Sequence, residues 1–158
     1  MTESTRQSPS FDKDVMLFSV GVTTYAIELN LVKEVILQPC HLTQLPITPP
    51  LIRGLILSRN DIYPLVHLGE HDVDLNNDEA RVILVTDGER RVALYAEHLH
   101  DILSLSTTNQ LNDEATVNPE WIHGVYDTQK GNVLFVDFNQ LYAVLVEQAD
   151  QVDSIPIS

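Results

Sequence analysis

The side chains with the clearest potential for chemistry in this sequence are five histidines and two nearby acids. They are His67, His71, His98, His100, His123, Asp72 and Asp74. Imidazole and carboxylate groups are the usual protein ligands of zinc, and two histidines four residues apart share a face on a helix. The segment "HLGEHDVD" instead has the pattern of a strand end entering a loop. The spacing therefore does not predict a metal site.

Other catalytic patterns are absent from the sequence. It contains no nucleophile elbow, no phosphate-cradling glycine loop and no dinucleotide fingerprint, because its six glycines are scattered. Ser, His and Asp are all present, but composition alone does not make a catalytic triad. We expect no catalytic residue, no cofactor and no metal; the enzymatic alternative is a small metal-dependent hydrolase that uses the His/Asp cluster.

Charge and composition restrict the partners and the compartment. A net charge of −14 repels phosphate backbones and anionic lipid headgroups, so we expect a protein partner and no nucleic acid. Cys40 is the single cysteine, which excludes an intramolecular disulfide. The chain has neither a signal-peptide pattern at its start nor an apolar run of the roughly 20 residues that span a bilayer. We expect a cytoplasmic protein without direct membrane insertion.

Apolar alternation predicts short strands throughout the middle of the chain. They are "VMLFSV", "TTYAIEL", "GLILSR", "IYPLVHL", "ARVILVTD", "RRVALYA", "DILSLS", "IHGVYD" and "NVLFVDF". Four-residue spacing of apolar side chains behind Asn30, a candidate N-cap, predicts a short helix over 31–36. Polar composition predicts a disordered tail at 1–14, a solvated loop at 69–80 and an acidic tail at 147–158.

The sequence also repeats itself weakly. "YAIELNLVKEVI" aligns with "VALYAEHLHDIL", and "LIRGL" aligns with "WIHGV", which places Gly54 over Gly124. Thirteen residues after each glycine, His67 aligns with Asp137 at the end of a strand. Two copies of one small β unit are predicted, with a glycine that meets a backbone requirement in each. Pro64 lacks an N–H and is expected on an edge strand or at a bulge.

The order and spacing of these segments resemble the CheW-like domain of bacterial chemosensory systems. The resemblance runs from "YAIELNLVKEVI" through "PPLIRGLILSRNDIYPLVHL", "RVILV" and "VALYAEHLHDILSL" to "IHGV" and "VLFVDFNQL", and we expect the domain over residues 15–146. It implies an all-β fold with short helices, arranged as two intertwined five-stranded SH3-like β-barrels. It also implies a non-enzymatic adaptor that couples receptors to the histidine kinase CheA, recruited to receptor arrays at the membrane.

Three departures from the family pattern are visible. Asn60 stands where the family usually has glycine, His67 where it has aspartate, and Ala96-Glu97 where it has Val-Asp. Asparagine tolerates the left-handed backbone region better than most residues, so Asn60 can replace a turn glycine. The resemblance thus implies a divergent coupling protein, for example one from a pathway that controls twitching by type IV pili.

The resemblance also assigns two binding surfaces. Glu34, with Val32 and Val35 beside it, matches positions that meet the kinase regulatory domain. The positions that face the cytoplasmic tip of the chemoreceptor are matched by Arg59, Val82, Leu99 and Ile102. From the residues alone, the apolar members are more often explained as core, Glu34 can be a solvated helix face, and Arg59 an internal ion-pair partner or a solvated side chain.

Overall fold

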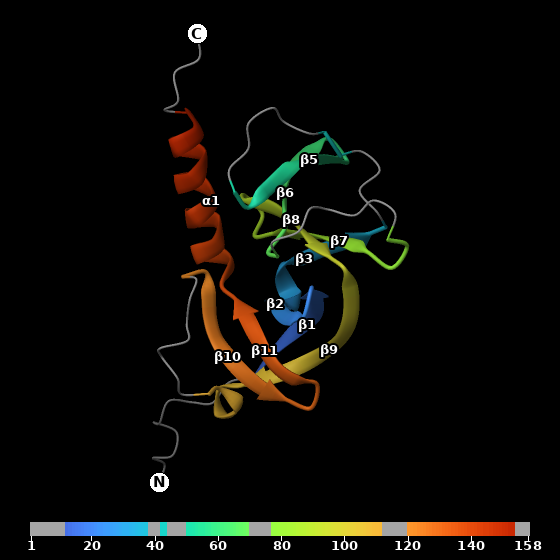
Figure 1. Ribbon diagram of the computed structural model, residues 1–158, viewed down its shortest axis with the longest axis vertical. Coiled ribbons are helices and arrows are strands. Elements are labelled where there is room, and N and C mark those ends of the chain that lie inside the picture. Colours follow the sequence, from blue (N-terminus) through green and yellow to red (C-terminus); the bar gives the residue numbers. More distant parts are fainter. Residues whose placement is uncertain (1–11, 38–41, 44–49, 70–76, 112–119, 154–158) are drawn as a thin grey trace.

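The computed structural model describes residues 12–37, 42–43, 50–69, 77–111 and 120–153 (Figure 1). The strands are β1 (Asp12–Val20), β2 (Thr23–Glu28), β3 (Val32–Ile36), β4 (Leu42–Thr43), β5 (Ile52–Ser58), β6 (Asp61–Val66), β7 (Arg81–Thr86), β8 (Arg91–Ala96), β9 (His98–Ser106), β10 (Ile122–Thr128) and β11 (Gly131–Val136). Two 3₁₀ turns, η2 (Leu29–Leu31) and η3 (Thr107–Asn109), and the helix α1 (Phe138–Asp153) complete the described elements. Each strand predicted from alternation is confirmed. None of the helices in these ranges is long and apolar enough to cross a bilayer.

The strands form two sheets with the same internal order. Barrel A has the order β10-β11-β2-β1-β9, and barrel B has the order β5-β6-β8-β7-β3 with the two-residue β4 added beside β5. Strands at the same position in the two orders are related by the sequence repeat. The predicted pair of intertwined five-stranded barrels is therefore confirmed, with one short extra strand in barrel B.

The barrels are intertwined because neither half of the chain completes a sheet alone. In barrel A, β1 and β2 come from the first half, and they pair with β9 and β11 from the second. The parallel contacts are equivalent in both barrels: Phe135 lies opposite Ala26, and Leu65 lies opposite Ala93. Strands separated by half of the chain therefore lie side by side (Figure 1).

The repeated glycines occupy the same place in the two barrels. The register shifts between Ile52 and Gly54 where β5 pairs with β6, and between Ile122 and Gly124 where β10 pairs with β11. A bulge at each glycine confirms the predicted repeat. The predicted backbone requirement is met at Gly54, whose φ is 157°, whereas Gly124 is not among the described glycines with positive φ and a Cβ there would meet the Gln110 side chain. The expectation for Pro64 is wrong, because β6 lies between β5 and β8. Pairing of β8 with β6 begins only at the next residue, so the missing N–H of Pro64 removes no ladder bond there.

Three apolar clusters hold the barrels together. One fills barrel B and includes Tyr63 and Tyr95, and another fills barrel A and includes Leu17 and Phe135. The largest lies between the barrels; we call it the inter-barrel core. Its buried members are Met16, Phe18, Val20, Tyr25, Ile27, Ile52, Val66, Leu68, Ile83, Val85, Val92, Leu94, Ala96, Trp121, Ile122, Val136, Phe138, Leu141 and Leu145. Both faces of the central strands are thus buried.

The helix α1 covers one side of the inter-barrel core and was not predicted. Phe138, Leu141 and Leu145 lie three and four residues apart, so they share the helix face that packs into this core. The carboxylate of Asp137 accepts a hydrogen bond from the Gln140 N–H at 3.1 Å and caps the first turn. This apolar spacing is visible in the sequence, but the polar composition of residues 147–158 favoured a tail over a helix.

The predicted helix over 31–36 is wrong. Residues Val32–Ile36 form β3, which pairs with β7 and follows a single 3₁₀ turn. A register shift between Val32 and Glu34 breaks the alternation of the strand, and this bulge produces the four-residue apolar spacing that resembled a helix. The solvated helix face considered for Glu34 therefore does not exist.

Both predicted tails begin or end at the wrong residue. β1 begins at Asp12, and Asp12–Asp14 pair with β9, because the neighbouring strand satisfies their backbone groups whatever their polarity. Residues 147–153 continue α1 rather than forming a tail. Residues 1–11, 154–158 and most of the predicted loop, 70–76, lie outside the described residues.

The turn between β5 and β6 has an unusual backbone. Arg59 and Asn60 have φ values of 52° and 71°, and they are the two non-glycine residues with positive φ in the described ranges. Since two residues connect the paired Ser58 and Asp61, this is the hairpin turn that requires a left-handed conformation at both central positions. The expectation that Asn60 replaces a glycine in the left-handed region is confirmed.

We expect Asn60→Gly to raise the free energy of unfolding by about 0.5 kcal/mol, because glycine occupies the left-handed region without steric cost. Urea denaturation of the two proteins measures the change. Gln129→Gly, in the equivalent turn of barrel A, is the control and should not be stabilising. A gain of the same size in the control would show that turn conformation is not the cause.

Candidate partner-binding surfaces

Glu34 and Arg59, assigned by resemblance to different surfaces, contact each other. The Nε of Arg59 donates to Oε1 of Glu34 at 3.3 Å, and Nη2 donates to Oε2 at 3.5 Å. Hydrogen bonding to this carboxylate and its charge raise the pKa of Arg59. The Arg59 side chain is 71% exposed and that of Glu34 is 30% exposed. The internal ion pair considered from sequence is therefore present, and much of the guanidinium still faces solvent.

The equivalent ion pair exists in the other barrel. Asp101, which aligns with Glu34, lies on β9 and is 2.9 Å from Nζ of Lys130 in the β10–β11 turn. The hydrogen bond from Lys130, followed by its charge, lowers the pKa of Asp101. In both barrels the pair connects an end strand of the sheet to the tip of a hairpin. The repeat alignment contained this signal, since an acid recurs on the strand and a base recurs in the turn.

More charges gather at the end of barrel B beside this pair. Asp61 lies 3.4 Å from Nη2 of Arg91 and 4.0 Å from Nζ of Lys33. With Glu34 and Arg59, three cations and two carboxylates meet where β3 approaches the β5–β6 hairpin. Exposed pairs of this kind contribute little to stability individually. Their main effect here is to orient the charged side chains at this end of the barrel.

The apolar residues assigned to the two surfaces differ in exposure. Val32 and Val35 are half-buried against the inter-barrel core, as is Leu99 on β9. Ile102 is 54% exposed and is available to a partner. The assignment of Val82 to a receptor contact is contradicted by its burial, because Val82 is 0% exposed inside barrel B.

The described histidines do not converge on one site, although the rings of His98 and His100 lie beside each other with centroids 6.4 Å apart. Nδ1 of His98 lies 2.7 Å from a carboxylate oxygen of Glu79, and Nε2 of His100 lies 3.0 Å from the Ser19 hydroxyl. His123 packs edge-on against Phe135 in barrel A. Within the described ranges, no group of three or more potential ligands could hold a metal ion. His71, Asp72 and Asp74 lie outside these ranges.

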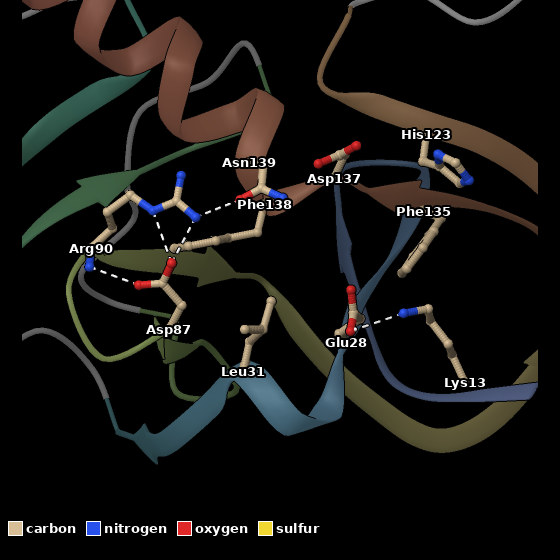
Figure 2. Close-up of a pocket in the computed structure, with 10 residues that line it drawn as sticks. All are labelled: Lys13, Glu28, Leu31, Asp87, Arg90, His123, Phe135, Asp137, Phe138 and Asn139. Carbon is tan, nitrogen blue, oxygen red and sulfur yellow. Dashed lines mark hydrogen bonds and ion pairs between the residues drawn. The ribbon is translucent and has the colours of Figure 1, made fainter.

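A cavity of about 400 Å³ opens where the β7–β8 turn meets the start of α1 (Figure 2). Its walls are Lys13, Glu28, Leu31, Asp87, Arg90, His123, Phe135, Asp137, Phe138 and Asn139. Several of its charged groups are paired within its walls: Lys13 with Glu28 at 3.3 Å, and Arg90 with Asp87 of the same turn at 2.6 Å. The pairing indicates a structural junction between the barrels and the helix.

Arg90 is the centre of this junction. Its guanidinium also contacts Oδ1 of Asn139 and lies over the rings of Phe138 and Tyr142, at 5.2 and 5.4 Å from their centroids. Hydrogen bonds from the backbone and side chain of Arg90 lower the pKa of Asp87 well below its ordinary value. This pair therefore ties the β7–β8 turn to the first turns of α1 (Figure 2).

The lowered pKa of Asp87 predicts a pH-dependent effect of Asp87→Asn. A carboxyl with a pKa below its ordinary 3.8 stabilises the fold at higher pH, and this stabilisation is lost as pH falls through the folded-state value. We expect the variant to have a lower urea midpoint than the parent at neutral pH, and the difference to shrink below pH 3.8. Glu89→Gln is the control. A difference that is independent of pH would contradict an ionic contribution.

With the barrels and their ion pairs established, comparison with known proteins gives a clear result. The family model for the CheW-like domain matches residues 14–146. The chain belongs to the CheW-like domain family. The domain predicted over 15–146 by resemblance agrees with these bounds within one residue.

A solved structure of this family has the same fold. The crystal structure of the scaffolding protein TtCheW from Thermoanaerobacter tengcongensis superposes with a TM-score of 0.67 at 19% sequence identity. The match covers 80% of this chain and 89% of TtCheW. At this identity the likeness concerns the fold alone.

Two departures from the CheW-like pattern have structural explanations. His67 is fully buried, stacks on Tyr95 with ring centroids 5.1 Å apart, and accepts the Gly69 N–H on Nδ1 at 3.0 Å. Its ring nitrogen thus accepts a local backbone N–H, as the carboxylate of Asp137 does in the other repeat. The carboxylate of Glu97 accepts the Gly21 N–H at 2.7 Å and joins the start of β9 to the β1–β2 turn.

Proposed function

We propose that this chain is a non-enzymatic adaptor of a bacterial chemosensory system, coupling methyl-accepting receptors to a CheA-type histidine kinase. The observation that carries the proposal is the CheW-like match, which spans both barrels of the described structure. The similarity to a protein described as a scaffold supports it. As an adaptor, the chain would work at the cytoplasmic side of receptor arrays, in a chemotaxis pathway or one that controls type IV pilus twitching.

The kinase-binding surface we propose is centred on Glu34, with Val32 and Val35 at its margin. All three belong to β3, an end strand of barrel B. A half-buried end strand with one acid and two half-buried apolar residues suits contact with another folded domain, because the apolar side chains add buried area and the acid adds specificity. The proposed partner is the regulatory domain of the kinase.

The receptor-binding surface we propose contains Arg59, Leu99 and Ile102. The planar guanidinium of Arg59 has more N–H donors than the carboxylate of Glu34 uses, so it can also donate to a partner. Ile102 adds an exposed apolar side chain on β9. Because Arg59 touches Glu34, the proposed kinase and receptor surfaces adjoin at this ion pair. A single substitution of either residue leaves the other charge unpaired, so single variants alone cannot separate the two contacts.

A charge exchange separates the ion pair from the binding surfaces. We expect Glu34→Lys to weaken binding of the kinase regulatory domain about tenfold or more, and Arg59→Ala to do the same for the receptor tip. The double variant Glu34→Arg/Arg59→Glu restores an ion pair with inverted signs. It should keep the thermal stability of the parent and still bind both partners weakly. Titrations of each variant with each partner measure these effects.

Asp101→Lys removes the equivalent ion pair of barrel A and is the matched control for kinase binding only, because Asp101 lies between Leu99 and Ile102 of the proposed receptor surface. Circular dichroism must first show that every variant is folded. Parental affinity of the double variant for both partners would show that the pair is structural and that our surfaces are wrong. A parent protein that binds neither partner would refute the adaptor function itself.

The hydrolase alternative makes a separate prediction. The adaptor needs no metal, so treatment with a chelator should leave the melting temperature of the purified protein unchanged. Calorimetry with and without chelator tests this, and a magnesium-saturated chelator serves as the control for ionic strength. A drop of several degrees would support a metal site that includes the histidines.

A further inference from the structure

The cavity at the start of α1 lies where barrel B contains two stacked rings. In the repeat, Glu28 aligns with Tyr95, and Asp137 aligns with His67. The rings of Tyr95 and His67 stack with centroids 5.1 Å apart, and the two residues are 1% and 0% exposed. Glu28 and Asp137 are half-buried and instead line the cavity of about 400 Å³. Barrel A therefore has an open space at a position that barrel B fills with aromatic rings.

The walls of this cavity include buried aromatic surface. Phe135 and Phe138 line it from the end of β11 and the start of α1, and both are buried. His123 packs edge-on against Phe135 with ring centroids 5.6 Å apart. Aromatic rings gain from offset and edge-to-face contacts with one another, and a volume of about 300–1,000 Å³ is usual for a small-molecule site. The cavity thus has both the size and the walls to hold a ligand ring.

The charges that line the cavity favour a cation. The guanidinium of Arg90 is occupied by the junction already described, and the ammonium of Lys13 is paired with Glu28. The carboxylate of Asp137 caps α1 through Oδ1, and within the described ranges no cation pairs with it. Figure 2 shows Asp137 apart from the Arg90 network. Besides His123, three carboxylates and two basic side chains line the cavity, so a positive ligand is attracted to it.

We propose that this cavity binds a small aromatic amine, a molecule with one aromatic ring and a primary ammonium group. The ring lies against Phe135, where it takes the part of the Tyr95 ring of barrel B, and the ammonium donates to the second carboxylate oxygen of Asp137. Lys13 gives an example of an ammonium held at this cavity, since its Nζ lies 3.3 Å from Oε2 of Glu28. This inference is independent of the proposed adaptor function and adds a small-molecule site to the chain.

Other ligands fit the cavity less well. An anion would meet its three carboxylates and two more, those of Asp12 and Asp14, in an adjoining cavity of about 340 Å³ that shares Lys13 and Glu28 as walls. A metal ion needs several converging ligands, and no group of three or more in the described part of the chain could hold one. An alkyl amine would satisfy the charge but leave the aromatic walls without a stacking partner.

The test titrates the full chain with three probes by calorimetry. Phenethylamine carries both a ring and an ammonium, phenylacetate carries the same ring with the opposite charge, and propylamine carries the ammonium without a ring. Asp137→Asn removes the charge but keeps a side chain that caps helices about as well. Asp127→Asn changes the net charge equally at an exposed position on β10 outside the cavity, and it is the matched control.

A second variant fills the cavity instead of changing its charge alone. Glu28→Tyr introduces into barrel A the residue that barrel B has at the equivalent position. Circular dichroism must show that each variant is folded before it is titrated. If one of the two variants does not fold, the other makes the same comparison with the parent and the control.

We expect phenethylamine to bind the parent with a Kd of about 1 mM or tighter, and the other two probes to bind about tenfold more weakly or less. Asp137→Asn and Glu28→Tyr should each weaken phenethylamine binding about tenfold or more, whereas Asp127→Asn should stay within about twofold of the parent. No binding of phenethylamine to the parent up to about 10 mM would overturn the inference. So would equal binding of phenylacetate or propylamine, or parental affinity in the folded variants.

Discussion

The structure depends on the apolar core that the two barrels share. Each barrel takes strands from both halves of the chain, so neither sheet exists until the halves have met. The inter-barrel core then buries the outer faces of the central strands, and α1 closes its open side with Phe138, Leu141 and Leu145. Because burial of apolar surface is the main favourable term in folding, this shared core makes the two barrels one cooperative unit.

The two barrels are similar enough for each to serve as a reference for the other. The glycine bulges, the parallel strand contacts and the ion pair between an end strand and a hairpin recur in both. These features are therefore explained by the fold. Features present in only one barrel need another explanation. The left-handed Arg59, the exposed Leu57 and Ile62, and the helix-capping carboxylate of Asp137 belong to this second group.

The Glu34–Arg59 ion pair changes how the proposed adaptor would work. The two proposed surfaces share this ion pair, so a partner that draws one charge away would alter the group presented to the other partner. The Arg59 side chain of this pair is largely exposed, and exposed pairs contribute little to stability. An adaptor between a receptor and a kinase benefits from such adjacency.

The sequence alone determined the strands, the repeat and the family, because alternation and turn residues are local and the recurring glycines mark equivalent bulges. It also supported the replacement of a turn glycine by Asn60. It could not determine β3, because a bulge there imitates helical spacing and only pairing with β7 distinguishes the two. Nor could it show that Val82 faces a barrel interior or that Glu34 meets Arg59. The surroundings of Val82 and Glu34 depend on which strands become neighbours. Because each barrel contains strands from both halves of the chain, those neighbours are set by contacts between residues distant in sequence.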